Sequence, residues 1–202
     1  MNKGEIRTHF KALLNRSDCT DALADTFVDQ SIARIQRTLR VPSMEKQQSY
    51  IIEDKAAFLF LPSDFLEIID LYYDKTSLTR VPLHQIMEYR DAGEFGTPKF
   101  FAREGGSLII YPYPTSGSVK LNYYAQFADM TADSDENNLA ASSSDMIIYA
   151  ALSFAADYYL DERGPLFEQR YVQFFTEVQE QANDAEMSGT VQAIRPTTSY
   201  ED

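Results

Sequence analysis

The sequence predicts an α+β protein, mainly α-helical: a four-helix bundle with an inserted small antiparallel β subdomain and an extended C-terminal tail. Three observations predict this class. Apolar residues recur at helical spacing near both ends of the chain, as on one face of a helix. Between those regions, the apolar runs are short and rich in β-branched and aromatic residues, which is typical of strands. After residue 187 no periodicity remains, so residues 188–202 are expected to be extended or disordered.

The N-terminal region is expected to form two amphipathic helices. In the first, the residues Ile6, Phe10, Leu13 and Leu14 fall on one face. The following SDCTD stretch supplies a turn and an N-cap. The second helix ends before Pro42, because a proline disfavours helical backbone at the preceding residue. Its apolar stripe consists of Leu23, Phe27, Val28, Ile32, Ile35 and Leu39.

The middle of the chain, from about residue 50 to residue 126, has the character of a β subdomain. Its apolar runs are SYII, FLFL, EIIDLYY, KFFAR, SLIIYP and SVKLNYYAQ. Gly105 and Gly106 lie between two of these runs and predict a hairpin turn. The stretch PLHQIMEYR is expected to add one or two helical turns between strands.

A second helical pair follows a polar loop. The first helix is expected to start at residues 142–145, and Gly164-Pro165 should end it and begin the next. The apolar stripes are Ile147, Ala151, Phe154 and Tyr158, then Phe167, Tyr171, Phe174, Phe175 and Val178. Packing both helix pairs together buries all four stripes. The predicted division is a helical bundle of residues 1–45 and 142–187, an inserted β-rich subdomain and loop of 46–141, and a tail of 188–202.

The composition limits the possible partners and compartments. Eighteen basic and 31 acidic residues give a net charge of −13, and such a surface repels nucleic acid. No apolar run approaches the roughly 20 residues of a membrane helix, so no membrane partner is expected. The N-terminus lacks an apolar signal-peptide stretch, and Cys19 is the only cysteine. Both features favour the reducing cytoplasm of the cell that makes the protein.

No catalytic, metal-binding or cofactor-binding motif is found. His9 and His84 have no second ligand at metal spacing. Asp133, Asp135 and Asn137 occupy three positions of a calcium loop, but its glycine and its final glutamate are missing. Carboxylates such as Glu67 and Asp70 are too common to indicate a glycan hydrolase. The tyrosines lack interspersed basic residues, so they favour a core or subunit contact over nucleic-acid stacking.

One short stretch forms a break between two apolar runs: Leu61, Pro62, Ser63, Asp64 and Phe65. Pro62 cannot donate to a sheet, so the strand should end there. Ser63 and Asp64 can cap the turn with their side chains. Phe65 can return to the core. We therefore expect a structural turn at Leu61, Pro62, Asp64 and Phe65.

These features, in this order, resemble the head-to-tail adaptor (connector) proteins of tailed bacteriophages, of the podovirus type. The matching parts span about residues 3 to 187. They are the helix DALADTFVDQSIARIQRTLRV, the Leu61-Pro62-x-Asp64-Phe65 turn, the strands LIIYPYPTSGSVKLNYY, and the helical pair DMIIYAALSFAADYYLDERGPLFEQRYVQFFTEV.

The resemblance implies a structural virion protein without enzymatic activity, assembled in the host cytoplasm and located at the head–tail junction. It would form a ring, usually of twelve copies, that binds the portal protein, extends the DNA channel and carries a tail tube or nozzle protein. DNA would pass without specific binding. In this family the C-terminal segment reaches towards the portal, which makes Val191, Ile194 and Arg195 candidate portal contacts. Two alternatives stay open, a cell-wall glycan hydrolase and an acidic protein-binding module.

Overall fold

The computed structural model describes residues 1–53, 58–90 and 93–187. They belong to two compact units. Among the described residues, the helical unit consists of Met1–Val41 and of residues 130–187, and the β unit lies within Pro42–Asp129. The predicted insertion ran from residue 46 to residue 141, whereas the loop after Met130 packs with the helices. Its carbonyl groups at Asp133 and Asp135 accept hydrogen bonds from the backbone of Gly4 and Lys3.

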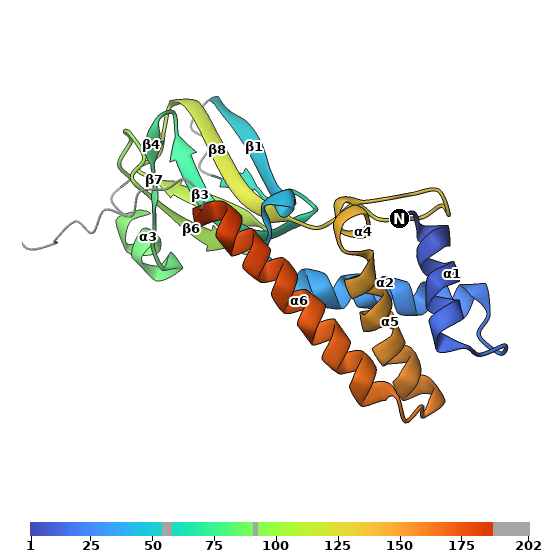
Figure 1. The fold of residues 1–202 in the computed structure, drawn as a ribbon. Helices are drawn as coiled ribbons and strands as arrows, with labels where there is room; N and C mark the ends of the chain where they lie inside the picture. Colours follow the sequence, from blue (N-terminus) through green and yellow to red (C-terminus); the bar gives the residue numbers. More distant parts are fainter. Residues whose placement is uncertain (54–57, 91–92, 188–202) are drawn as a thin grey trace, which may run out of the picture. The chain divides into compact units, whose positions relative to one another are not determined.

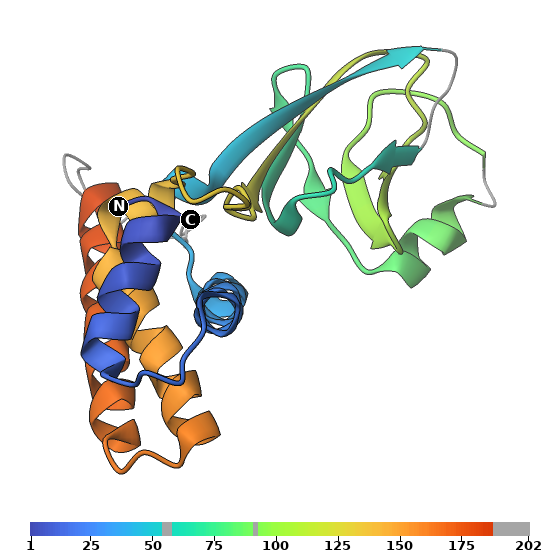
Figure 2. The ribbon, with the colours of Figure 1, turned by 90° about the vertical axis from the view of Figure 1, so that its right-hand side faces the viewer.

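The helical unit is built around one buried helix. Its elements are α1 (Lys3–Leu14), α2 (Asp21–Thr38), α4 (Asn138–Ser142), α5 (Ser144–Tyr159) and α6 (Gly164–Met187). Helix α5 is buried on most sides and packs against all the others. Figure 2 shows α2 nearly end-on while α1, α5 and α6 run side-on. Helix α2 therefore crosses the other helices, and the structure does not confirm the predicted four-helix bundle.

The helix ends follow local chemistry, with one correction. Thr20 caps α2 by accepting a hydrogen bond from the backbone of Leu23, which confirms an N-cap within SDCTD. Gly164 was expected to lie past the end of a helix, but it is the first residue of α6. The left-handed residue that ends α5 is Leu160, with φ of 53°. The loop before α5 also contains α4, which has five residues, too few to give a periodic pattern.

The β unit contains two sheets in its described part. The first has the order β1 (Glu45–Glu53), β8 (Ser116–Ala125), β3 (Phe65–Tyr73), β4 (Thr76–Ser77); the second has the order β2 (Phe58–Phe60), β7 (Ser107–Tyr111), β6 (Phe100–Glu104), β5 (Thr79–Arg80). A short 3₁₀ turn, Pro42–Met44, precedes β1. Most neighbours are antiparallel, as predicted, but β5 and β6 are parallel. The hairpin between β6 and β7 turns at Gly105, with φ of 59°.

The core of the β unit lies between the two sheets, and a helix covers the outer face of the second sheet. Side chains from both sheets share one buried cluster that includes Leu71, Leu121, Phe101 and Leu108. The alternate residues of β6 and β7, among them Ala102 and Ile109, form a second cluster with Ile86 of α3 (Leu83–Arg90). Figure 1 shows α3 beside these strands. Strand alternation thus places three layers in the order sheet, sheet, helix.

Within the described residues, no helix combines the length and the apolar character that crossing a membrane requires.

Candidate functional site

The Leu61–Phe65 turn joins the two sheets of the β unit. Strand β2 ends at Phe60 in the second sheet, and β3 begins at Phe65 in the first. The backbone of Leu61 donates to the Gly106 carbonyl at 3.0 Å, and the Phe65 amide donates to the Pro62 carbonyl at 3.1 Å. The chain therefore crosses from one sheet to the other at a hydrogen-bonded corner.

The Asp64 side chain fixes this corner from both sides. Its carboxylate accepts a hydrogen bond from Lys46 Nζ at 2.7 Å and another from the Tyr123 hydroxyl at 3.0 Å. Burial opposes ionisation of Asp64, but these two hydrogen bonds outweigh it and lower the pKa of its carboxyl group. Burial and the bond to Asp64 raise the pKa of Tyr123 to about 12. The Phe65 ring stacks on Tyr123, with centroids 5.8 Å apart. These contacts give the corner a structural role.

An ion-pair ladder joins α1 to α2, and the sequence analysis missed it. Lys3, Arg7 and Lys11 lie four residues apart on α1, and Asp29, Asp25 and Asp21 lie four apart on α2. They pair in that order, because residues four apart share a helix face. Lys3 is buried, and its Nζ also donates to the Met130 carbonyl at 2.8 Å. The matching four-residue spacing of opposite charges is the signal that could have predicted this ladder.

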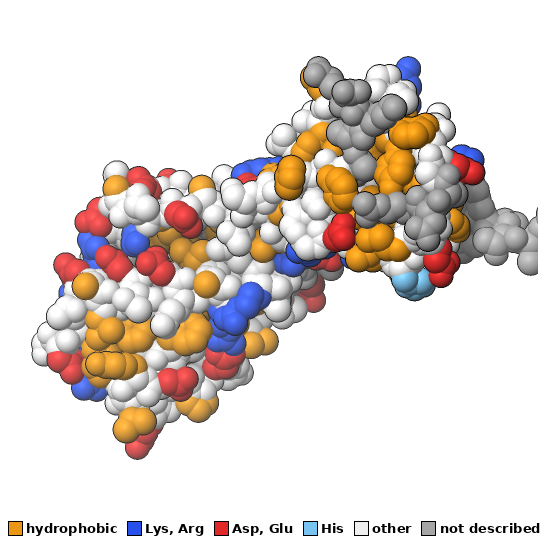
Figure 3. Space-filling model, turned by 180° about the vertical axis from the view of Figure 1, so that it is seen from behind, with side chains coloured by type: hydrophobic (Ala, Val, Ile, Leu, Met, Phe, Trp, Pro, Cys, Tyr) orange, Lys and Arg blue, Asp and Glu red, His pale blue; other side chains and the backbone are white. Residues whose placement is uncertain are grey.

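One end of the helical unit exposes large apolar side chains. Leu160 is 89% exposed, and Tyr158, Leu166 and Leu13 are 44% to 62% exposed. Leu13 was expected to lie on the buried face of α1, and it does not. Arg163, just before α6, donates hydrogen bonds to the Leu13 and Leu14 carbonyls and so connects the α5–α6 turn to the end of α1. Figure 3 shows hydrophobic side chains gathered on the helical unit. We call Leu13, Tyr158, Leu160 and Leu166 the helical apolar surface.

The β unit also exposes large apolar side chains on its edge strands. Ile51 of β1 is 80% exposed and Phe60 of β2 is 77% exposed, with Phe58 also exposed. Strands β1 and β2 are the edge strands of their sheets, and the Tyr50 hydroxyl donates to the Phe60 carbonyl at 2.6 Å. Ile52 and Leu59 point into the core between the sheets, so Ile51 lies on the outer face of the first sheet and Phe58 and Phe60 lie on the outer face of the second. Large exposed apolar side chains favour burial against another protein. We call Ile51, Phe58 and Phe60 the β-edge surface, after the edge strands that carry them.

Two carboxylates of a groove in the helical unit, Asp161 and Glu168, are bound to arginines. The groove lies between α2, α5 and α6, has a volume of about 580 Å³, and is lined by Arg34, Phe154, Asp157, Asp161 and Glu168 among others. A hydrogen bond from Arg163 lowers the pKa of Asp161 to about 2. The bond from Arg34 lowers the pKa of Glu168. A glycosidase acid needs a raised pKa, so neither carboxyl group suits that role.

The other residues considered for chemistry have structural positions. His9 and His84 are both exposed, and no group of residues that could hold a metal ion occurs in the described chain. Asp133 pairs with Arg7. Asp135 accepts hydrogen bonds from the backbone of Thr131 and Ala132, which lower its pKa. Asp70 accepts a hydrogen bond from Asn122.

The candidate portal contacts Val191, Ile194 and Arg195 lie outside the described residues. The structure therefore brings together the corner residues Leu61, Pro62, Asp64 and Phe65 and leaves the tail prediction as it stands. The sites that the sequence analysis missed are the ion-pair ladder and the two apolar surfaces.

The comparisons with known proteins add the family. A comparison with the curated proteins found no match. The model of the SU10 adaptor protein family matches residues 1–196, which includes both units and the first part of the tail. The match supports a phage head–tail adaptor, a structural component of the virion, and it does not confirm the podovirus type. The chain belongs to the SU10 adaptor protein family.

Proposed function

We propose that the protein forms a ring of twelve copies beneath the portal, which extends the DNA channel and provides the attachment platform for a tail tube or nozzle protein. The family match over residues 1–196 carries this proposal. The helical apolar surface and the β-edge surface support it, because large apolar side chains exposed on a single chain favour burial in an assembly. Assembly in the host cytoplasm and a role in genome packaging and ejection belong to the same proposal.

The charge of the chain suits a channel through which DNA moves. A net charge of −13 on each copy is multiplied around a ring. Acidic side chains that face the channel repel the phosphate backbone and keep DNA from binding. DNA then passes without specific contacts.

The groove residues favour this function over a glycan hydrolase. Asp161 and Glu168 both have a lowered pKa, whereas the proton donor of a glycosidase needs a raised one. We therefore expect no release of sugar fragments from purified cell wall. Activity that disappears when one specific carboxylate is neutralised would contradict the structural function.

The tail is proposed to be the portal anchor, through Val191, Ile194 and Arg195. We would test this with a chain that ends at Met187 and with a full chain carrying Val191→Ser, Ile194→Ser and Arg195→Gln. Both should keep the melting temperature of the full chain, since the apolar stripe of α6 ends near Val178 and Ala182. Both should bind the portal at least about tenfold more weakly, because each lost contact repeats around the ring.

The matched control carries Gln192→Ala and Thr197→Ala in the same segment and should bind as the full chain does. Equal portal binding by the truncated and full chains would show that the tail is not the anchor. The contact would then lie on residues 145–186.

A further inference from the structure

We propose that a two-arginine pocket on the β unit of one copy binds an acidic stripe on α6 of the neighbouring copy. This inference rests on the ring proposed above and names two surfaces that meet in it. The pocket is defined by Arg80 and Arg103, and the stripe by Glu177, Glu180 and Asp184.

The pocket presents two cationic side chains without a carboxylate in its lining. Its volume is about 350 Å³, and its lining consists of Arg80, Val81, Pro82, Leu83 and Arg103. Both arginines are exposed. Arg103 donates to the Gly105 carbonyl at 3.2 Å and lies over the Phe65 ring, which orients its guanidinium group. In the described parts of the chain, neither arginine forms an ion pair.

Several arginines of the helical unit differ in this respect. Arg7, Arg34 and Arg163 each pair with a carboxylate of their own unit. The chain has 31 acidic and 18 basic residues, so acidic partners are abundant. A guanidinium group binds carboxylates through a planar set of donors. Two such groups facing one pocket favour an acidic protein surface as the partner.

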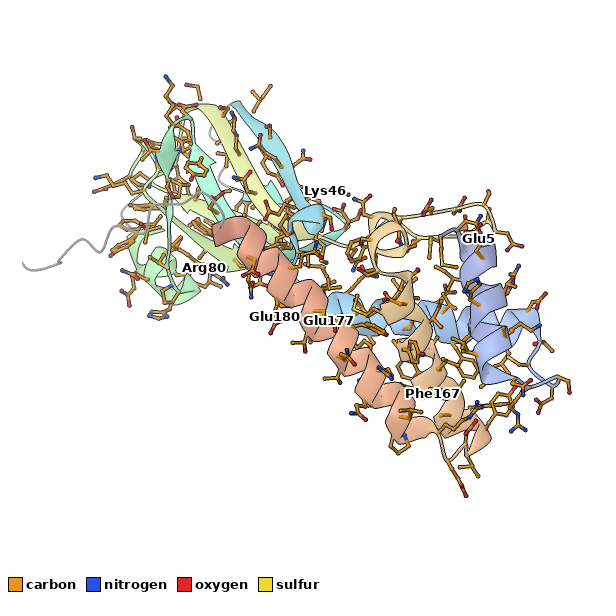
Figure 4. The ribbon with its side chains drawn as sticks, viewed as in Figure 1. Glu5, Lys46, Arg80, Phe167, Glu177 and Glu180 are labelled. Atoms are coloured by element: carbon orange, nitrogen blue, oxygen red, sulfur yellow. The ribbon has the colours of Figure 1, made fainter. Side chains whose placement is uncertain are left out.

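A second copy offers such a surface on α6. Glu177, Glu180 and Asp184 are spaced by three and four residues, so they share one face of the helix. All three are exposed, and Figure 4 labels the first two along α6 and Arg80 on the β unit. Gln173 donates a hydrogen bond to Glu177. None of the three carboxylates has an ion-pair partner among residues 1–53, 58–90 and 93–187. The two surfaces are therefore complementary in charge.

The pairing has the form that a closed ring needs. A ring is built from heterologous contacts, in which one surface of a subunit binds a different surface of the next. Exposed ion pairs are individually weak, and the net charge of −13 on each copy opposes association. A pair of free copies should therefore separate easily. Copies held side by side on a template gain the contact repeatedly.

A charge-reversal experiment tests the contact between copies. One full-length variant carries Arg80→Glu and Arg103→Glu, and the other carries Glu177→Lys, Glu180→Lys and Asp184→Lys. Each alone places like charges against each other, and we expect it to fill portal rings about tenfold less well than the wild type. In a 1:1 mixture the variants can alternate around an even-numbered ring, and every contact then joins opposite charges. The mixture should recover most of the wild-type occupancy, measured by mass photometry of portal complexes.

The control variant carries Lys75→Glu and Lys120→Glu, two exposed lysines of the same unit, and has the same charge change as the pocket variant. It should fill rings as the wild type does. If Arg103→Glu lowers the melting temperature, a variant with Arg80→Gln and Arg103→Gln takes the place of the pocket variant when ring filling is measured for one variant alone. Full rings from the pocket variant alone would overturn the proposal. A mixture no better than its components would also overturn it, and would point to a contact within one chain.

Failure of this contact can be distinguished from failure of the proposed function. A wild-type chain that leaves the portal empty contradicts the proposed function. The contact between copies is then tested without portal, by sedimentation velocity of the concentrated variants in low salt. Greater association of the mixture than of either variant supports it, and equal association overturns it.

Discussion

Lys3 connects three parts of the helical unit through one buried side chain. Its Nζ lies 3.3 Å from Asp29 of α2 and donates to the Met130 carbonyl. Lys3→Met removes the donor and leaves a buried carbonyl without a partner, so we expect a loss of about 1–3 kcal/mol in the free energy of unfolding. Lys11→Met is the control, because Lys11 pairs with the exposed Asp21 and its loss should be clearly smaller. Urea unfolding measures both; equal losses would contradict the special role of Lys3.

Two tyrosine hydroxyls with different surroundings give a second test at this scale. The buried hydroxyl of Tyr159 meets no hydrogen-bond partner of good geometry among the described residues and has only the Cys19 thiol near it, a weak hydrogen-bonding group. The Tyr123 hydroxyl instead donates to the Asp64 carboxylate. Tyr159→Phe should therefore leave the free energy of unfolding unchanged or raise it. Tyr123→Phe should lower it by about 1–2 kcal/mol, since it removes a bond to a charged acceptor. Thermal unfolding compares the two variants; a larger loss for Tyr159→Phe would contradict the hydrogen-bond assignment.

At the scale of elements, Gly117 opens strand β8 in a conformation that other residues rarely adopt. Its φ is 122°, and an added Cβ would lie 2.6 Å from the Tyr73 hydroxyl oxygen. Gly117→Ala should cost about 1–3 kcal/mol of stability. Gly106→Ala in the β6–β7 turn is the control, because a Cβ there meets no atom within 4 Å. Chemical denaturation of both variants measures the difference, and equal stability would show that Tyr73 moves aside without cost.

The turn between α5 and α6 predicts a pH dependence. Hydrogen bonds from Arg163 lower the folded-state pKa of Asp161 to about 2, below its ordinary value of 3.8. The stabilisation is present above pH 4 and decreases as the pH falls towards 2. Wild type should exceed Asp161→Asn in unfolding free energy by up to about 1 kcal/mol at pH 6, since Arg163 is partly exposed. The difference should shrink on acidification, as urea unfolding at pH 6, 4 and 3 would show. A constant difference would contradict the ion pair.

The sequence predicted most of the helices and strands, but little of how they pack against one another. The helical stripes and the strand runs correspond to α1, α2, α5, α6 and the longer strands. Strands β4 and β5 have two residues each, too short for a period to be seen. A stripe also defines which face is buried but not the crossing angle, which depends on the packing of both helices. The stripes therefore predict the helices but not the crossing of α2, and the predicted four-helix bundle is not confirmed.

In the candidate site, too, the sequence predicted the local turn but not the distant contacts. The corner at Leu61–Phe65 was expected from its proline and capping residues. Its partners Lys46 and Tyr123 are 18 and 59 residues from Asp64, and sequence spacing does not indicate such distant contacts. Exposure of Leu160 and Phe60 depends on how α5 ends and on which strands form the sheet edges. Both surfaces therefore became visible only in the folded chain.

At the scale of the whole molecule, charge and assembly are linked. Each copy carries a net charge of −13, which favours separate chains in solution. The exposed apolar surfaces on both units favour contacts once copies are held together. We therefore expect a chain that stays monomeric alone and assembles on a template, so that rings do not form before the portal is present.

The most direct test of this account is the mass of the purified protein with and without the portal from the same genome. Mass measurement by light scattering should give about 23 kDa for the chain alone. With the portal, the mass should rise by a full ring of copies, and electron microscopy should show that ring at one end of the portal. A stable dimer that ignores the portal would contradict the adaptor function and favour an acidic binding module.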